Sequence, residues 1–214
     1  MQNTSAVVIV AAGSSRRMQG RDKLWLPLAG RITLARTIDV FENSLLIDTI
    51  ILVLNAERLT EANALRQHEA WHKIAAIVPG GPRRQDSVRA GLDALAQCSP
   101  TTQWVMIHDG ARPLVTPAIL EAGLQAAQER GAAIAAVPVK DTIKQAQHGV
   151  ISATPDRSRL WSIQTPLVFA FPLICQAHHS PAAQQDATDD AALLERLGQR
   201  VTIFPGAYTN IKIT

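Results

Sequence analysis

The stretch AVVIVAAGSSRRMQG, residues 6–20, is an apolar run that stops at a glycine and then turns basic. Its first part, AVVIVAA (6–12), is continuously apolar and rich in β-branched residues, which is typical of a strand buried on both faces of a largely parallel sheet. The second part matches neither the G-x-G-x-x-G dinucleotide fingerprint nor the G-K-S/T end of a P-loop. We therefore expect a first strand that ends at an anion-binding loop of another kind.

Strand-like and helix-like segments alternate through the following sequence. Strands are expected at 49–55, 73–80, 104–109 and 132–139, and helices at 33–44, 61–71, 86–98 and 116–131. Asp86 or Ser87 is predicted to cap the third helix, while Thr116-Pro117 and Gly131 are predicted to begin and end the fourth. The alternation predicts right-handed βαβ units in a Rossmann-like three-layer α/β/α sandwich.

The pattern changes to a more polar one at about residue 138. Residues 138–160 alternate polar and apolar side chains around QHGV (147–150), which is typical of a hairpin turn. An isolated two-stranded hairpin is marginal in water, so we expect this arm to lean on another surface, such as a second subunit. Because no linker or internal repeat is present, we expect one domain over residues 1–214 with a projecting arm within 138–160.

Composition and charge narrow the class of protein. The chain has 214 residues, of which 47% are hydrophobic and 18% charged. It has no apolar stretch of bilayer-spanning length and no basic start of a signal peptide, so we expect a cytoplasmic protein without a membrane partner. Two cysteines, Cys98 and Cys175, are too few and too far apart for a disulfide framework or a metal knuckle.

The net charge of +3 is concentrated in two compact clusters. One comprises Arg16, Arg17, Arg21 and Lys23, and the other comprises Arg83, Arg84 and Arg89. With one tyrosine and no repeat of basic and aromatic residues, stacking on nucleic-acid bases is poorly supported. We therefore expect a small polyanion as partner, and no nucleic acid.

Polar residues follow three of the predicted strands, at the edge where ligands bind in open α/β sheets. After the first strand, the small residues at 11–13 would let backbone N–H groups approach a phosphate, and Arg16, Arg17 and Lys23 would supply charge for a triphosphate. The alternative there is a tight turn followed by a solvated basic face. In GGPRRQDSV (80–88), the paired glycines would pack against a flat base.

The second of these loops offers a hydroxyl and the third a carboxylate. Ser87 would either present its hydroxyl to a ligand or only cap its helix. In IHDGARP (107–113), Asp109 comes after the apolar run WVMI, at the end of the expected strand, and is suited to hold Mg²⁺ that bridges phosphates, although it could also be a loop cap. His108 could be a ligand, although a lone histidine beside an aspartate is more often structural, and no role is assigned to it. The His178-His179 pair is interpreted as a surface feature and the tryptophans as packing residues.

Several later polar residues are ambiguous when each is considered alone. They are Arg157, Thr165, Thr188, Asp189 and Lys212, each of which has an ordinary surface interpretation. Asp189 and Asp190 are equally explained as the start of the helix AALLERLG.

Taken together, seven motifs carry a resemblance to a known family. They are A-A-G-x-x-x-R-M from Ala11 with Lys23 after it, G-G-x-x-R-x-D-S-V from Gly80, H-D-x-A-R-P from His108, P-V-K-D-T from Pro138, D-R…L-W…T-P from Asp156, T-D-D-A from Thr188 and N-I-K-I-T from Asn210. This ordered set resembles the 2-C-methyl-D-erythritol 4-phosphate cytidylyltransferases of non-mevalonate isoprenoid synthesis over almost the whole chain. The first motif alone is shared by many nucleotidyltransferases.

The resemblance implies the nucleotidyltransferase fold of nucleotide-diphospho-sugar transferases and a reaction in which methylerythritol phosphate attacks CTP. Arg17 and Lys23 would stabilise charge on the α-phosphate, and Arg157 and Lys212 would aim the nucleophilic oxygen. The implied CTP-binding residues are Ala11, Ala12, Gly13, Ser14, Gly80, Gly81, Ser87 and Asp109, and Asp109 would also hold Mg²⁺. The implied acceptor-binding residues are Asp109, Arg112, Thr142, Arg157, Thr165, Thr188 and Lys212. A homodimer is implied in which the 138–160 arm reaches into the partner's site.

Several other functions remain open on the sequence alone. A cytidylyltransferase acting on another polyol phosphate, such as ribitol phosphate, or a molybdopterin-type nucleotidyltransferase would share the first motif. A non-catalytic nucleotide-binding module would bind CTP without releasing pyrophosphate. An NAD-linked oxidoreductase is suggested only by the opening strand and glycine, and the missing second and third glycines count against it.

Overall fold

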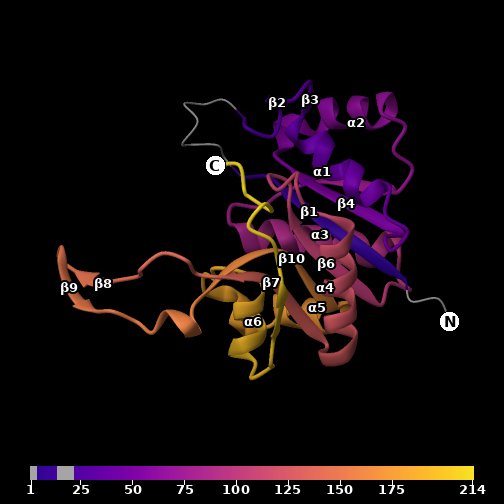
Figure 1. Cartoon of the computed structure of the whole chain (residues 1–214). Helices are drawn as coiled ribbons and strands as arrows, with labels where there is room; N and C mark the ends of the chain where they lie inside the picture. Colours follow the sequence, from indigo (N-terminus) through magenta and orange to yellow (C-terminus); the bar gives the residue numbers. More distant parts are fainter. Residues whose placement is uncertain (1–3, 14–21) are drawn as a thin grey trace.

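The computed structural model of the chain describes residues 4–13 and 22–214. A seven-stranded sheet in the order β11-β7-β10-β6-β1-β4-β5 forms the middle layer of this part (Figure 1). Its strands are β1 (Ser5–Ala11), β4 (Thr49–Leu54), β5 (Ile74–Pro79), β6 (Trp104–Asp109), β7 (Ala132–Pro138), β10 (Trp161–Ala170) and β11 (Thr202–Pro205). Only β10 is antiparallel to its neighbours within this sheet, so the expectation of a largely parallel sheet is confirmed.

Helices cover both faces of the sheet. One side carries α1 (Thr33–Glu42), α2 (Leu59–His68) and α4 (Pro117–Arg130), and the other carries α3 (Arg84–Cys98), α5 (Phe171–His179) and α6 (Ala191–Arg196). Alternate residues of β1 enter the two cores, with Val7 and Ile9 facing α1 and α4 while Val8 faces α3. Both faces of β1 are therefore buried, which explains its unbroken apolar sequence. The predicted three-layer sandwich is confirmed.

Short elements complete the described part. They are β2 (Pro27–Leu28), β3 (Arg31–Ile32), β8 (Gln145–Gln147), β9 (Val150–Ala153) and the 3₁₀ turns η2 (Ala56–Arg58), η3 (Arg157–Arg159) and η4 (Pro181–Gln184). Across residues 4–13 and 22–214, none of the helices has the length and apolar character that crossing a bilayer requires.

Helix boundaries agree with the sequence at α4 and differ at α3. Thr116 occupies the N-cap of α4, and Gly131 ends that helix with a φ of 85°. Helix α3 begins before Asp86, with Arg83 at its N-cap. The carboxylate of Asp86 accepts a hydrogen bond from the Arg83 backbone N–H at 3.2 Å, so it belongs to a capping box. The prediction that Asp86 or Ser87 occupies the cap is therefore wrong.

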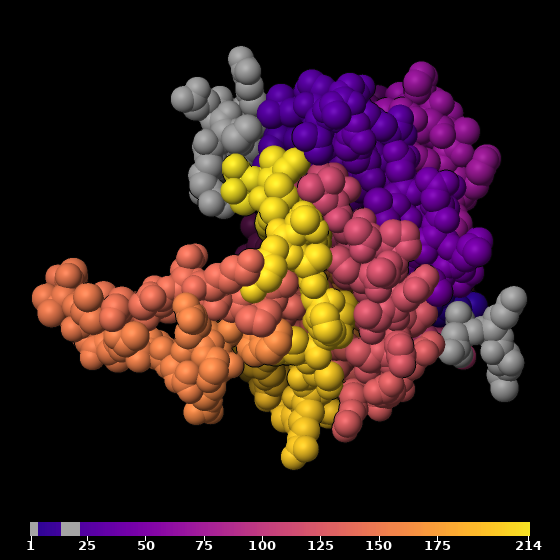
Figure 2. Space-filling view, in the orientation of Figure 1, coloured from indigo at the N-terminus to yellow at the C-terminus, as the bar shows by residue number. Residues whose placement is uncertain are grey.

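The predicted hairpin lies in the arm, which projects from the body of the molecule (Figures 1 and 2). Strands β8 and β9 pair in antiparallel fashion around His148 and Gly149, whose φ angles of 51° and 79° suit a tight hairpin turn. At its tip, Val150 is 71% exposed and Ile151 is 61% exposed. Two β-branched apolar side chains are thus left without a core in the single chain.

The carboxyl ends of four parallel strands lie at one edge of the sheet. Ala11 of β1 pairs with Leu54 of β4, which in turn pairs with Pro79 of β5. On the other side of β1, Val10 pairs with Asp109 of β6. The loops that follow these strands must therefore meet above this edge.

Candidate functional site

A cavity of about 520 Å³ opens at this edge. Its described wall includes Ala11, Ala12, Gly13, Lys23, Gly81, Ser87, Asp109 and Lys212. These residues come from β1 and its loop, from the start of α3, from the end of β6 and from the C-terminal segment. Four separate parts of the chain converge there because their strands share a direction and the chain's last residues return over the edge.

Glycine is required where the loop after β5 approaches its neighbours. A Cβ atom added at Gly80 would lie 2.3 Å from the Cβ of Ala12 and 2.7 Å from Ser87 Oγ, which is closer than carbon atoms pack. The Gly81 backbone N–H donates to Ser87 Oγ at 3.1 Å. The Ser87 hydroxyl therefore shapes the glycine loop from within α3 and also lines the cavity.

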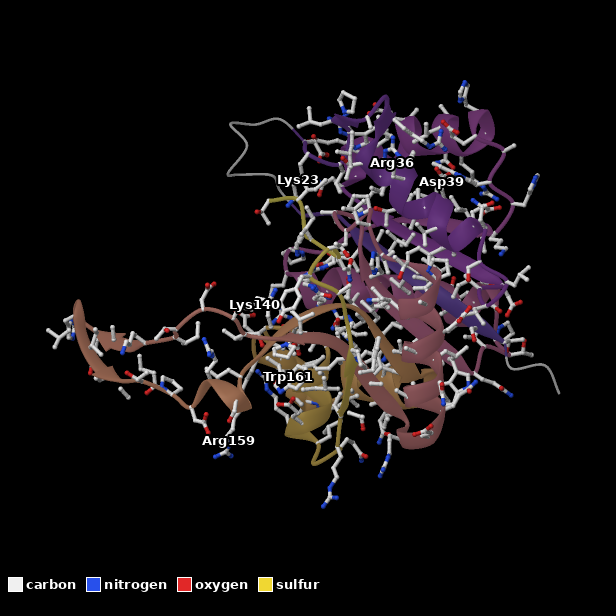
Figure 3. All side chains as sticks on the ribbon, in the orientation of Figure 1. Lys23, Arg36, Asp39, Lys140, Arg159 and Trp161 are labelled. Carbon is white, nitrogen blue, oxygen red and sulfur yellow. The ribbon has the colours of Figure 1, made fainter. Side chains whose placement is uncertain are left out.

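The C-terminal segment supplies charge and structure to the cavity. Ile213 N–H donates to the backbone carbonyl of Ala111 at 2.9 Å, and Lys23 Nζ donates to the carbonyl of Ile213 at 2.6 Å. Figure 3 shows Lys23 beside this segment. Earlier in the segment, the buried Asn210 side chain donates to the carbonyl of Thr165 at 2.9 Å. These bonds hold Lys212 at the rim of the cavity.

Asp109 is a buried carboxylate surrounded by cations. Its Oδ2 lies 2.8 Å from Lys212 Nζ and 3.6 Å from Arg112 Nε, and its Oδ1 lies 3.8 Å from Arg84 Nε. Burial raises the pKa of Asp109, but the attraction of Lys212 and Arg84 outweighs burial and holds the pKa below its ordinary value. Asp109 is therefore ionised at neutral pH.

A chain of hydrogen bonds through Thr165 and His108 fixes the backbone at Asp109. Its backbone N–H donates to Thr165 Oγ1 at 3.1 Å, and Thr165 Oγ1 lies 3.0 Å from His108 Nδ1. His108 Nε2 lies 3.2 Å from the Arg112 carbonyl, which can only accept, so Nε2 carries the proton and Nδ1 accepts from Thr165. Burial lowers the pKa of His108 from about 6.5 to about 4. His108 is therefore a neutral structural residue.

A second cavity of about 390 Å³ adjoins the first. Arg84, Asp109 and Lys212 line both cavities, while Arg112, Thr165 and Thr188 line the second but not the first. A further hollow of about 670 Å³ continues from Arg112 and Lys212 towards the base of the arm. There Lys140 Nζ lies 3.6 Å from the centre of the Tyr208 ring (Lys140 is labelled in Figure 3). The site is thus two adjoining cavities divided by one carboxylate and its cations.

The structure brings together most of the predicted site residues that it describes. Ser14, Ser15, Arg16, Arg17 and Arg21 lie outside the described residues. Thr142 and Arg157 are exposed on the arm and line none of the three cavities. Arg157 Nη1 donates to the Lys140 carbonyl at 2.7 Å. Within one chain, then, these two arm residues do not join Asp109 and Lys212.

One carboxylate is available for a divalent cation at the cavity. Among the described residues, no group of three or more histidine, cysteine or acidic side chains is arranged to hold a metal ion. Asp109 fits the sparser pattern of Mg²⁺ sites in which one or two carboxylates are completed by substrate phosphates and water. Its Oδ1 is the less occupied oxygen, because Lys212 and Arg112 both approach Oδ2.

Sequence patterns did not predict the network of side chains that joins Arg84 to Asp190 and His178. Arg84 Nη1 donates to Asp190 Oδ2 at 2.7 Å, and His178 Nε2 lies 3.1 Å from Asp190 Oδ1. His178 is 1% exposed, so its interpretation as a surface residue is wrong, while His179 is exposed as expected. Asp189 accepts a hydrogen bond from the Ala192 N–H at 2.9 Å at the start of α6. The helix-start interpretation thus holds for Asp189, whereas Asp190 also has an ionic role.

Known proteins are similar to the chain throughout its length. The family model described as 2-C-methyl-D-erythritol 4-phosphate cytidylyltransferase matches residues 5–214. A protein of that name from Dehalococcoides mccartyi is 48% identical over 208 residues, covering 97% of this chain and 89% of the relative. One from Alkaliphilus oremlandii is 46% identical over 222 residues, covering 100% of this chain and 92% of the relative.

Solved structures show the same similarity. The 4-diphosphocytidyl-2C-methyl-D-erythritol synthase from Anaerococcus prevotii has a TM-score of 0.86 and 29% identity, covering 99% of this chain and 90% of that structure. The 2-C-methyl-D-erythritol 4-phosphate cytidylyltransferase from Thermus thermophilus has a TM-score of 0.78 and 27% identity, with coverage of 97% and 91%. Both the family resemblance and the fold expected from the motifs are confirmed.

Proposed function

The chain belongs to the 2-C-methyl-D-erythritol 4-phosphate cytidylyltransferase family, and on that premise we propose which residues carry the reaction. Its activity is the transfer of CMP from CTP to 2-C-methyl-D-erythritol 4-phosphate in isoprenoid biosynthesis. An oxygen of the acceptor phosphate forms a bond to the α-phosphorus of CTP, the bond from that phosphorus to the β-phosphate oxygen breaks, and pyrophosphate leaves. A phosphate monoester is already a nucleophile at neutral pH, so the protein must mainly align two anions and neutralise their charge.

The first cavity is proposed to bind CTP. Gly80, Gly81 and Ser87 would contact the cytosine, a role supported for Gly81 and Ser87 by their position in the cavity wall. Ala11, Ala12, Gly13 and Ser14 would wrap the triphosphate, and Arg17 and Lys23 would neutralise charge that develops on the α-phosphate. For Lys23 the proposal is supported by its position in the cavity wall. The roles of Ser14 and Arg17 rest on the family motif.

The second cavity is proposed to bind the acceptor. Arg112 and Lys212 would contact its phosphate, and Thr188 would contact its polyol. The observation that carries this division is that Asp109 and Lys212 line both cavities, because the transferred phosphorus must pass between the two substrates. Thr165 is already engaged by the Asp109 N–H and by His108, so its main proposed role is to orient Asp109.

A magnesium ion is the cofactor that we propose. When bound, it would neutralise the triphosphate. The protein's own part would be to offer Asp109 as the ligand, and the hydrogen bond from the Asp109 N–H to Thr165 fixes the backbone of that residue. Lys212, 2.8 Å from the same carboxylate, would share its charge with the phosphates.

We also propose a homodimer in which the arm within 138–160 delivers Thr142 and Arg157 to the partner's acceptor cavity. The proposal is supported by the absence of these residues from the cavities of their own chain and by the exposed apolar tip. Deletion of residues 141–158 is expected to give monomers of low activity, measured by analytical ultracentrifugation and turnover. A fully active dimer would contradict this arrangement.

The nucleotide substrate supports a cytoplasmic location, and neither nucleic acid nor membrane is proposed as a partner.

Pyrophosphate release tests the assignment of the substrates. The protein should be assayed with CTP, ATP, GTP and UTP, with methylerythritol phosphate as acceptor and Mg²⁺ present or chelated. We expect release with CTP, and a strong loss after chelation. Faster turnover with ribitol phosphate would identify a different acceptor, and CTP binding without release would identify a non-catalytic module.

A further inference from the structure

Arg84, the first residue of α3, belongs to a row of paired polar side chains that reaches from His178 of α5 to Asp109. Its Nη1 donates to Asp190 Oδ2 at 2.7 Å, and Asp190 Oδ1 lies 3.1 Å from Nε2 of His178. On its other side, Arg84 Nε lies 3.8 Å from Asp109 Oδ1. Asp190 is 0% exposed. Solvent therefore screens the contact between Arg84 and Asp190 only weakly.

Arg84 lies where the two cavities adjoin. It lines both of them, as do only Asp109 and Lys212 among the residues described at these walls. About 30% of its side chain remains accessible, whereas the carboxylate that it pairs with is fully enclosed. The guanidinium is thus anchored at one end and available to a ligand at the other.

The charges of Arg84 and Asp190 are fixed at neutral pH. Burial lowers the pKa of Arg84, but the attraction of Asp190 and Asp109 outweighs burial and keeps that pKa above its ordinary value. Burial raises the pKa of Asp190, but Arg84 and the hydrogen bond with His178 hold it below the ordinary range. A permanent cation therefore faces the place where two phosphate-bearing substrates meet.

Gln85, the residue after Arg84, fastens the segment before Asp190 to the start of α3. The Gln85 side chain donates to the Ala183 carbonyl at 2.6 Å and accepts from the Ala187 N–H at 2.8 Å. Gln85 is itself buried, so these bonds fasten the segment before Asp190 to the start of α3. The segment that leads into Asp190 is therefore fixed against the start of α3, beside Arg84.

We propose that Arg84 binds a substrate phosphate at the junction of the two cavities, and that Asp190, braced by His178, is the positioning residue that holds its guanidinium there. The inference rests on the proposed function, because it takes the reacting phosphates to lie at this junction. A guanidinium suits the role because its planar fork can donate to two phosphate oxygens while another nitrogen stays on Asp190.

The test compares Arg84→Gln, Asp190→Asn and the double variant by steady-state pyrophosphate release. Loss of one charge-assisted hydrogen bond predicts that Arg84→Gln lowers kcat/KM by about 10- to 100-fold. Arg84→Lys should recover part of this loss, because it restores the charge without the fork. Arg130→Gln is the control, since Arg130 is exposed at the end of α4 and lines neither cavity. It should leave kcat/KM unchanged.

The double variant distinguishes a role of Asp190 in positioning Arg84 from a role in the stability of the fold. If Asp190 acts through Arg84, Asp190→Asn should lower kcat/KM by about fivefold or more in the wild type and by less than about twofold in the Arg84→Gln background. Because the double variant replaces both charges with hydrogen-bonding amides, it avoids a buried unpaired ion, and its thermal melting should stay near that of the wild type. Equal losses from Asp190→Asn in both backgrounds would overturn the positioning role. Activity of Arg84→Gln within twofold of the wild type would overturn the phosphate contact.

A binding measurement tests the phosphate contact of Arg84 separately from the proposed acceptor. Calorimetric titration with CTP and with inorganic pyrophosphate should show affinities for Arg84→Gln at least about tenfold weaker than the wild type. If the wild type binds these probes but fails to turn over methylerythritol phosphate, the proposed acceptor is wrong while the titration still tests Arg84. Unchanged affinity for both probes, together with wild-type turnover of the variant, would reject the inference alone.

Discussion

The neutral state of buried His108 predicts how the stability of the protein changes with pH. Its pKa falls from about 6.5 to about 4 on folding, so between these values the unfolded chain binds a proton that the folded chain does not. The stabilisation is fully present above about pH 6.5 and is lost as the pH falls towards 4. Between about pH 7.5 and pH 5, this residue alone is expected to reduce the free energy of unfolding by about 2 kcal/mol.

The measurement is urea or thermal unfolding of the wild type and of His108→Gln across this pH range. The variant cannot be protonated and keeps a donor for the Arg112 carbonyl, which His108 Nε2 contacts at 3.2 Å. It will be less stable at pH 7.5, because it loses the ring contact with Phe41 at 4.9 Å and leaves the site imperfectly filled. The difference between the two proteins should then shrink by about 2 kcal/mol at pH 5, or about 4–8 °C in Tm.

The difference between the two proteins isolates His108, because every other titrating group is present in both. His68→Gln, at a histidine whose side chain is 82% exposed, is the matched control for replacing an imidazole by an amide. A difference between wild type and His108→Gln that stays constant from pH 7.5 to pH 5 would refute the assignment of a neutral, hydrogen-bonded imidazole behind Asp109.

Three further predictions concern catalysis and assembly. Lys23→Ala is expected to lower kcat by about 100-fold or more, because it removes a cation proposed to face the α-phosphate; near-normal pyrophosphate release would reject that role. Gly80→Ala is expected to raise KM for CTP, because its Cβ would lie 2.3 Å from that of Ala12 and must displace the loop; an unchanged KM would contradict this close approach. Replacing Val150 and Ile151 together by lysine is expected to weaken the proposed dimer, with sedimentation showing monomers and melting of the monomer body unchanged; an intact dimer would show that the arm tip is not part of the interface.

Local patterns predicted the strands and most helices because their causes are local. The run 104–109 coincides with β6, since a strand buried on both faces needs an unbroken apolar sequence. Gly131 ends α4 because a left-handed backbone favours glycine. The start of α3 was misplaced because Asp86 is as good a partner at the third helical position as at the cap.

Some residues of the candidate site were also predictable from local sequence, and others were not. Asp109, Ser87 and Gly81 could be identified from the sequence, because each lies near the end of a strand or in the first turn of a helix at the ligand edge. Lys212 became specific only within the ordered set of motifs, since a lone lysine near a chain end has no distinctive local pattern. Its position 2.8 Å from Asp109 depends on the return of the C-terminal segment over β6.

A parallel-rich α/β sheet and the loops that bear its chemistry were predictable from the order of residues, because apolar periodicity and turn residues act over a few positions. The partners of Arg84 and His178 depend instead on how distant helices pack. Arg84 and Asp190 are 106 positions apart, and nothing in the residues around either one indicates the other. Their pairing follows from the packing of α5 against both α3 and α6 on one face of the sheet, which brings Arg84 at the start of α3 to Asp190 at the N-cap of α6.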